Sequence, residues 1–200
     1  MTSLLSRRTF LRASAALGLL GLAGCTKDGM VRFHGTNVTG ATYGRDFRLT
    51  DPDGRKRTLA AFKGQAILLF FGYTQCPDVC PTALARAVDI KRLLGEDGGQ
   101  LQVLFVTVDP ERDTPEVLKA YTAAFDPSFL ALYSDLAGLA QMAQEFNLIY
   151  KKVPTGASYS MDHTSVSYVY DPRGKLRLKF LHSQSADACA ADLRNILRSA

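Results

Sequence analysis

Two cysteines four residues apart, Cys76 and Cys80, are the residues of this chain best suited to chemistry. The apolar run 66–71 precedes them, and a stretch with apolar residues at helical spacing, 82–94, follows, so a strand is predicted to give way to a helix here. Residues at this spacing at the start of a helix share one face, and the positive end of the helix dipole favours thiolate. The two sulfurs are therefore predicted either to bind one metal ion together or to form a disulfide.

The spacing of the two cysteines favours a metal site over the other chemistries. Thiol–disulfide enzymes more often have two residues between their cysteines, and here there are three. The wider spacing suits two ligands on successive turns of a helix. Zinc in a structural site commonly needs four ligands, and the sequence has no further closely spaced pair of cysteines to supply the other two. A purely structural disulfide is the remaining alternative, and it is less favoured because the pair lies in a turn typical of functional sites.

His163 is predicted to be the third ligand of this site. It lies in the polar segment 160–165, which is interpreted as a loop just before a strand, at the edge of the sheet that also carries the cysteine turn. Two thiolates and one imidazole form a soft set of ligands that suits copper, especially Cu(I), and leaves room for a further weak ligand with Cu(II). A histidine that only forms hydrogen bonds at the surface is the alternative.

Three more residues lie close to the proposed ligands. Asp78 is between the cysteines and Asp109 follows a predicted buried strand, so either carboxylate is placed to tune the charge of the site. Helix capping or loop hydrogen bonding is the favoured role for both. Tyr73, just before the cysteines, is predicted to pack at the rim of the site.

The other histidines and the distal cysteine are predicted to take no part in the site. Cys189 falls on the apolar stripe of the last predicted helix, so a buried inert thiol is favoured over a resolving cysteine or a ligand. His34 lies in a polar segment near the N-terminus and His182 follows the last predicted strand. Neither has a partner at ligand spacing, so both are predicted to be solvated.

The segment 1–24 has the pattern of a bacterial export signal. A twin-arginine motif at 6–12 precedes an uncharged apolar core at 13–23, which is shorter than the ~20 residues that a membrane-spanning helix needs. The core ends in the lipobox-like sequence 22–25, so Cys25 is predicted to begin the mature chain and to carry lipid on its sulfur. An uncleaved N-terminal anchor is the alternative.

The predicted location is therefore a bacterial cell membrane, with a lipid anchor and a domain that faces the periplasm or the outside. Segment 25–42 is polar and rich in Gly and Thr, which predicts a flexible tether. Thiols outside the cytoplasm tend to be oxidised or occupied, so the redox state of the cysteine pair matters. The formal charge of +5 includes three signal arginines, and no basic run with interleaved aromatics remains, which argues against a nucleic-acid partner.

The order of predicted elements indicates the fold class of the remaining segment, 43–200. Alternating strands and helices, followed by strands with hairpin-like turns and a last helix, predict an α/β three-layer sandwich with a leading β-hairpin at 47–59. The predicted strands are 66–71, 101–108, 129–133, 148–153, 165–170 and 175–181, and the predicted helices are 82–94, 115–125, 136–146 and 186–198.

Three segments of the chain resemble the Sco/SenC family: the cysteine motif at 72–82, the Asp-Pro-Glu-Arg-Asp-Thr-Pro motif within 106–115, and Asp-His-Thr-Ser at 162–165. The resemblance runs from about residue 44 to 197. It implies a thioredoxin-like fold, a single copper ion held by Cys76, Cys80 and His163, and a part in building the binuclear copper centre of cytochrome c oxidase. The chain departs from the family at Gln75, where relatives often have His or another residue, and in the short loop 154–160.

The resemblance implies a metallochaperone that delivers copper to the copper-bearing subunit of cytochrome c oxidase. Cys76 and Cys80 are then also a redox-active pair, because a disulfide between them abolishes copper binding. Further expected partners are the membrane, through the lipid, and other periplasmic copper carriers or thiol reductases. The alternative is a periplasmic thiol–disulfide oxidoreductase that reduces partner cysteines, while a peroxidase of the same fold has no separate support in the sequence.

Overall fold

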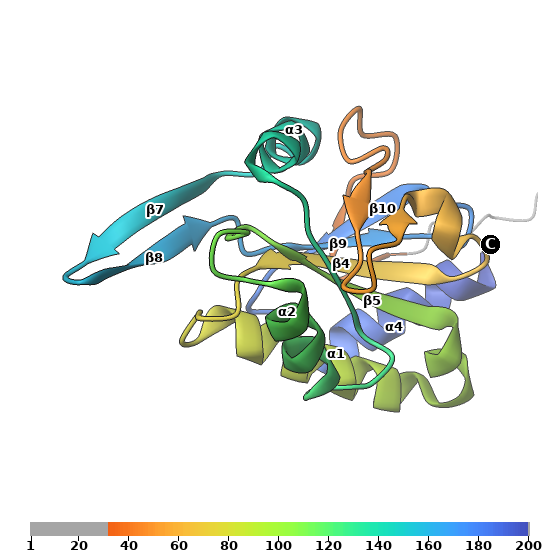
Figure 1. Ribbon diagram of the computed structural model, residues 1–200. Coiled ribbons are helices and arrows are strands. Elements are labelled where there is room, and N and C mark those ends of the chain that lie inside the picture. The colour runs from red at the N-terminus through yellow and green to blue at the C-terminus, as the bar shows by residue number, and fades with distance from the viewer. Residues whose placement is uncertain (1–31, 200) are drawn as a thin grey trace, which may run out of the picture. The chain divides into compact units, whose positions relative to one another are not determined.

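The computed structural model describes residues 32–199 (Figure 1). The predicted signal peptide 1–24, the predicted lipid attachment at Cys25 and the first part of the predicted tether lie outside the described residues. Among the residues from 32 to 199, no helix combines the length and the apolar character needed to cross a membrane.

A six-stranded sheet forms the centre of the domain, in the order β1-β10-β9-β4-β5-β6. Strand β4 pairs in parallel with β5, which pairs in parallel with β6, while β9 runs antiparallel to β4. All seven residues of β4 are buried, as expected for a central strand covered on both faces. The strands are β1 (Thr36–Asn37), β4 (Ala66–Gly72), β5 (Leu101–Thr107), β6 (Leu130–Leu132), β9 (Ser167–Tyr170) and β10 (Leu176–Phe180).

Helices cover the two faces of this sheet (Figure 1). On one face lie α1 (Val79–Leu94), α2 (Pro115–Ala123) and α4 (Ala186–Arg198), and on the other lies α3 (Leu136–Phe146). Adjacent residues of β4 point to opposite faces, so Phe70 packs on Phe105 of β5, whereas Phe71 packs on Phe146 of α3. This arrangement confirms the predicted α/β three-layer sandwich.

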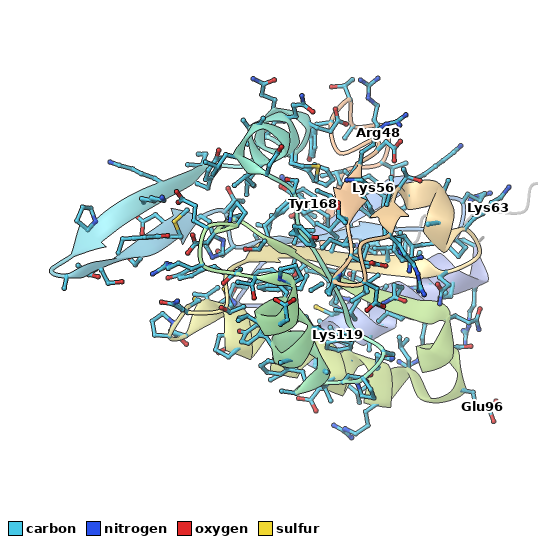
Figure 2. All side chains as sticks on the ribbon, viewed as in Figure 1. Arg48, Lys56, Lys63, Glu96, Lys119 and Tyr168 are labelled. Atoms are coloured by element: carbon cyan, nitrogen blue, oxygen red, sulfur yellow. The ribbon has the colours of Figure 1, made fainter. Side chains whose placement is uncertain are left out.

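Smaller elements complete the domain. The predicted leading hairpin is present as β2 (Leu49–Thr50) and β3 (Lys56–Arg57), and two short 3-10 helices, η1 (Leu59–Phe62) and η2 (Gly95–Gln100), follow β3 and α1. In Figure 2, charged side chains such as Lys63 and Glu96 project from the periphery, while Tyr168 lies within the core.

Side-chain caps fix where three of the helices begin. The hydroxyl oxygen of Thr114 accepts from the Val117 N–H, with Pro115 in the first helical position of α2. Asp135 caps α3 and Ser185 caps α4 in the same way. The observed bounds of α2, α3 and α4 lie within two residues of those predicted.

The predicted polar loop before β9 is instead a strand. β7 (Tyr150–Thr155) and β8 (Ser158–His163) form a hairpin of their own that projects away from the central sheet (Figure 1). The interpretation as a loop is wrong because β8 alternates polar and larger residues, and only Met161 among them is fully buried. His163 is consequently the last residue of a strand.

The predicted tether 25–42 also needs correction in its second half. β1 pairs with β10, and the buried carboxylate of Asp192 on α4 accepts from the backbone N–H groups of His34 and Gly35. The side chain of His34 is exposed, as predicted, but its Nδ1 atom lies 3.0 Å from the same carboxylate, a partner that the sequence did not reveal. The partner lies 158 residues away, and a buried carboxylate needs such donors.

Candidate metal centre

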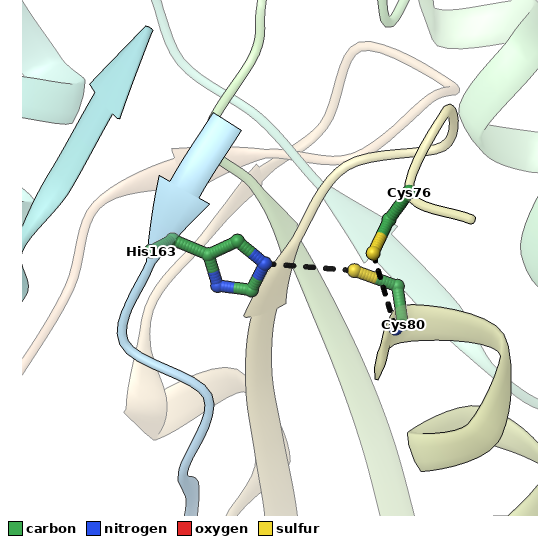
Figure 3. A group of neighbouring side chains, drawn as sticks. All are labelled: Cys76, Cys80 and His163. Carbon is green, nitrogen blue, oxygen red and sulfur yellow. Dashed lines mark hydrogen bonds between the residues drawn. The ribbon is translucent and has the colours of Figure 1, made fainter. Parts of the chain in front are cut away.

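Cys76, Cys80 and His163 converge on one point of the molecule (Figure 3). One ligand atom from each, the two Sγ atoms and an imidazole nitrogen, lie within 4.8 Å of one another. The Nε2 atom of His163 is 3.7 Å from Cys80 Sγ, and the Cys80 N–H donates to Cys76 Sγ at 3.5 Å. Both thiols are free. The structure therefore brings together all three residues that the sequence proposed as ligands.

The two cysteines are positioned by the turn between β4 and α1. Cys80 lies in the first turn of α1 and is fully buried, whereas Cys76 lies in the preceding loop and is half-buried. The last residue of β4, Gly72, makes this packing possible. A Cβ atom at Gly72 would lie 2.8 Å from Cys80 Sγ and 2.7 Å from Cε2 of Phe105, so a larger residue does not fit without displacing them.

The imidazole of His163 is oriented by its surroundings. Its ring packs edge-on against Phe70 and Tyr73, with centroids 6.1 and 5.9 Å away. Its Nδ1 lies 3.1 Å from the carbonyl oxygen of Thr164, which can only accept a hydrogen bond. Nδ1 therefore carries the proton of the neutral ring, and the lone pair of Nε2 faces the sulfurs, which is the tautomer that a metal ligand requires.

Burial sets the protonation of the site. It raises the pKa of the Cys80 thiol above its ordinary value, and it lowers the pKa of the His163 imidazole. The sequence predicted that the helix dipole favours thiolate, but for Cys80 burial favours the protonated thiol. Without a metal, the site at neutral pH thus holds a protonated Cys80 and a neutral His163.

The buried side chain of Asp113 holds the cysteine loop in place through hydrogen bonds. Its buried carboxylate accepts from the N–H and the hydroxyl of Thr74, at 3.1 and 2.6 Å, and from the hydroxyl of Thr107 at 2.6 Å. Burial raises the pKa of this carboxyl group. The sequence placed Asp113 within a family motif but assigned it no role, because only the fold brings β5 and the cysteine loop together.

The other residues near the site have mostly structural roles. Asp109 accepts from Arg112 Nε and from the Tyr159 hydroxyl, which agrees with the predicted loop hydrogen bonding. Asp78 is exposed at the N-cap position of α1, and its carboxylate forms no cap but accepts from the Thr82 hydroxyl at 3.4 Å. Tyr73 is buried and packs on the imidazole, as expected.

Two further side chains, one near the site and one outside it, each have a buried polar atom without a hydrogen-bond partner in the described residues. The Tyr121 hydroxyl on α2 is buried and has no hydrogen-bond partner among residues 32–199. Burial, and then the nearby Cys80, raises its pKa, so this residue is a neighbour of the site that the sequence did not reveal. His182 is half-buried and its Nδ1 atom is buried without a partner in that range, so the prediction of a solvated side chain holds only in part.

Cys189 lies outside the cluster. It is fully buried on α4, where the sequence placed it, and burial raises the pKa of its thiol to about 11. An inaccessible thiol with a raised pKa is a poor nucleophile.

The chain is similar to proteins of one family. Residues 36–198 match the family model described as SCO1/SenC. A SCO2-like protein of Rickettsia typhi is 33% identical over 170 residues, which cover 84% of this chain and 82% of the relative.

Two solved structures have similar folds. ScoI from Bradyrhizobium japonicum, solved with copper bound, is 40% identical with a TM-score of 0.69, and the match covers 76% of this chain and 98% of that chain. The apo Sco1 protein from Thermus thermophilus is 37% identical with a TM-score of 0.75, and the match covers 84% and 99%.

Replacing Gly72 with alanine is expected to lower the free energy of unfolding by about 1–3 kcal/mol, because the added methyl group collides with Phe105 and Cys80. Urea denaturation measures this loss. Gly99→Ala is the matched control, since a Cβ atom there meets nothing within 4 Å. Equal stabilities of the two variants would show that the close approach at Gly72 is unimportant.

Proposed function

Because the chain belongs to the SCO1/SenC family, we propose that it binds one copper ion through Cys76, Cys80 and His163 and delivers that ion to cytochrome c oxidase. The observation that carries this proposal is the convergence of two sulfurs and one imidazole nitrogen within 4.8 Å. The copper bound to the related ScoI of Bradyrhizobium japonicum supports the choice of metal. The expected recipient is the copper-bearing subunit of the oxidase.

The set of ligands suits copper as cargo. Two thiolates and one imidazole are soft donors that match Cu(I), and Cu(II) takes a further weak ligand. Gln75 supplies no such ligand, because its Oε1 accepts from Arg112 at 3.1 Å. The charge of the arriving ion displaces the thiol protons, which offsets the effect of burial on Cys80.

The difference in exposure between the cysteines sets the order in which their sulfurs are replaced during copper release. Cys76 is half-buried, while Cys80 is fully buried. A ligand of the recipient therefore replaces Cys76 first and Cys80 last, and the ion is never without coordination.

Thiol–disulfide exchange is a second candidate function of the same pair. The Cys80 N–H donates to Cys76 Sγ, which is the more accessible of the two sulfurs and therefore the one that meets a partner disulfide. The Cys76 thiolate attacks a partner disulfide, which releases one partner thiolate and leaves a mixed disulfide. Cys80 then loses its proton and attacks the Cys76 sulfur, which releases the second thiolate. The partner gains two electrons, and the oxidised pair can no longer bind copper.

We also propose that Cys25 is lipidated and anchors the domain at a bacterial cell membrane, facing the periplasm or the outside. The proposal is supported by the twin-arginine motif, the short apolar core and the lipobox-like sequence before Cys25. At that location, other periplasmic copper carriers and thiol reductases are the expected further partners.

The reduced protein is expected to bind one copper ion, and Cys76→Ser or Cys80→Ser to abolish tight binding. His163→Ala is expected to weaken binding at least about tenfold, because one of three ligands is lost. Metal analysis and competition with a copper chelator give stoichiometry and affinity.

Cys189→Ala is the matched thiol control and is expected to bind copper as the wild type does, since Cys189 lies outside the cluster. Undiminished binding by His163→Ala would disprove the three-ligand site. In cells that lack the native protein, these ligand variants are also expected to leave cytochrome c oxidase short of copper, whereas Cys189→Ala restores it.

The affinity for Cu(I) is expected to fall at least about tenfold per pH unit, from pH 8 down to 6.5, because binding must displace the proton of the buried Cys80 thiol. Its raised pKa means that the free protein keeps this proton, which binding must release. The lowered pKa of His163 means that protons compete with copper for the imidazole only below its ordinary value of 6.5. His163→Ala should therefore show the same slope above pH 6.5, and a shallower slope would contradict these protonation states.

Labelling of cells with palmitate is expected to mark the wild-type protein and not Cys25→Ser, because the lipid is attached through this sulfur. Cys189→Ser is the control and should keep the label. A labelled Cys25→Ser variant would refute the proposed attachment.

A further inference from the structure

The hairpin that carries His163 is not fixed by the central sheet. In the described part of the chain, β7 and β8 pair only with each other. At the base of the hairpin, Thr164 and Ile149 exchange hydrogen bonds, but these join its two arms and not the hairpin to the cysteine loop. Side-chain contacts must therefore hold His163 over the sulfurs.

Tyr159 provides the main contact between the hairpin and the loop after β5. It lies on β8 four residues before His163, so the two side chains share one face of the strand. Its hydroxyl donates to Asp109 Oδ1 at 2.8 Å. The guanidinium carbon of Arg112 lies 3.6 Å from the centre of its ring, and Arg112 Nη1 donates to its carbonyl oxygen at 2.9 Å.

The same guanidinium also contacts the cysteine loop. Arg112 Nη1 donates to Oε1 of Gln75, the residue directly before Cys76, and Nε donates to Asp109 Oδ2. The Arg112 side chain is only 17% exposed, and Asp109 is fully buried. The buried pair of Arg112 and Asp109 thus joins the loop that carries Cys76 to the strand that carries His163.

A second ion pair between the same segments is weaker. Lys152 of β7 pairs with Glu111, but both side chains are nearly half exposed. Exposed pairs of this kind contribute little to stability, so the buried contact of Arg112 is the stronger candidate for holding the hairpin.

We propose that Arg112 is a positioning residue that holds the β7–β8 hairpin against the cysteine loop and so sets the distance between His163 and the two sulfurs. This inference rests on the proposed function and deepens it. Arg112 touches none of the proposed ligands and acts through Tyr159 and Gln75. The role needs a planar guanidinium that stacks on an aromatic ring while it donates from several nitrogens, which lysine cannot reproduce.

The test compares Arg112→Lys with Arg92→Lys, a matched change at an exposed ion pair on α1. Arg112→Lys is expected to weaken copper binding about 10- to 100-fold, and Arg92→Lys to leave it unchanged. The Cu(II) absorption spectrum of Arg112→Lys should shift toward that of His163→Ala. In the metal-free protein, the amides of β7 and β8 should exchange their hydrogens faster.

A double-mutant cycle separates positioning from general stability. In the His163→Ala background, Arg112→Lys should change copper affinity by no more than about twofold, since its effect passes through the histidine. Tyr159→Leu removes the stacked ring, keeps Arg112, and should reproduce both the affinity loss and its dependence on His163.

Three results would overturn the proposal: an unchanged affinity in Arg112→Lys, an equal loss with and without His163, or an unchanged amide exchange of the hairpin. If the wild type binds no copper, the proposed function fails. The exchange measurement on the metal-free protein then still decides whether Arg112 holds the hairpin.

Discussion

The ligand geometry depends on two buried carboxylates in the loop after β5. Asp113 accepts hydrogen bonds from Thr74 in the cysteine loop, and Asp109 accepts one from Tyr159 in the hairpin. A carboxylate buried without donors is costly, so each stabilises the position of the segment that supplies its donors. The loop that carries both carboxylates thus joins the cysteine loop to the hairpin, although Cys80 and His163 are 83 residues apart in the sequence.

The burial that fixes this geometry also limits the chemistry. Cys80 with a raised pKa and His163 with a lowered pKa are both neutral, so neither carries a charge into the interior without a metal. Copper binding and disulfide formation both require Cys80 to lose its proton. They use the same two sulfurs, so an arriving ion and an oxidising partner compete for one pair.

The sequence predicted the central sheet and the helices well, because local signals determine them. The apolar run of β4 and the caps at Thr114 and Asp135 are visible without a partner. The hairpin was missed because β8 has too few apolar residues to be recognised as a strand. It is a strand because its backbone pairs with β7, which no local pattern reveals.

In the candidate site too, features set by the local sequence were predictable, and features set by contacts between distant segments were not. The three proposed ligands could be named from residue type, spacing and family resemblance, and the structure brings them together. The protonation of Cys80 was not, because it follows from burial by residues that the fold brings near. Arg112 and Tyr159 are 47 residues apart, and no spacing rule connects them. The cysteines lie on a rigid strand-to-helix turn, whereas the histidine lies on a hairpin outside the sheet. Because side-chain contacts alone hold this hairpin over the sulfurs, the histidine is the ligand with the weakest attachment to the core, and the cysteine turn keeps its own geometry whether or not the imidazole is in place.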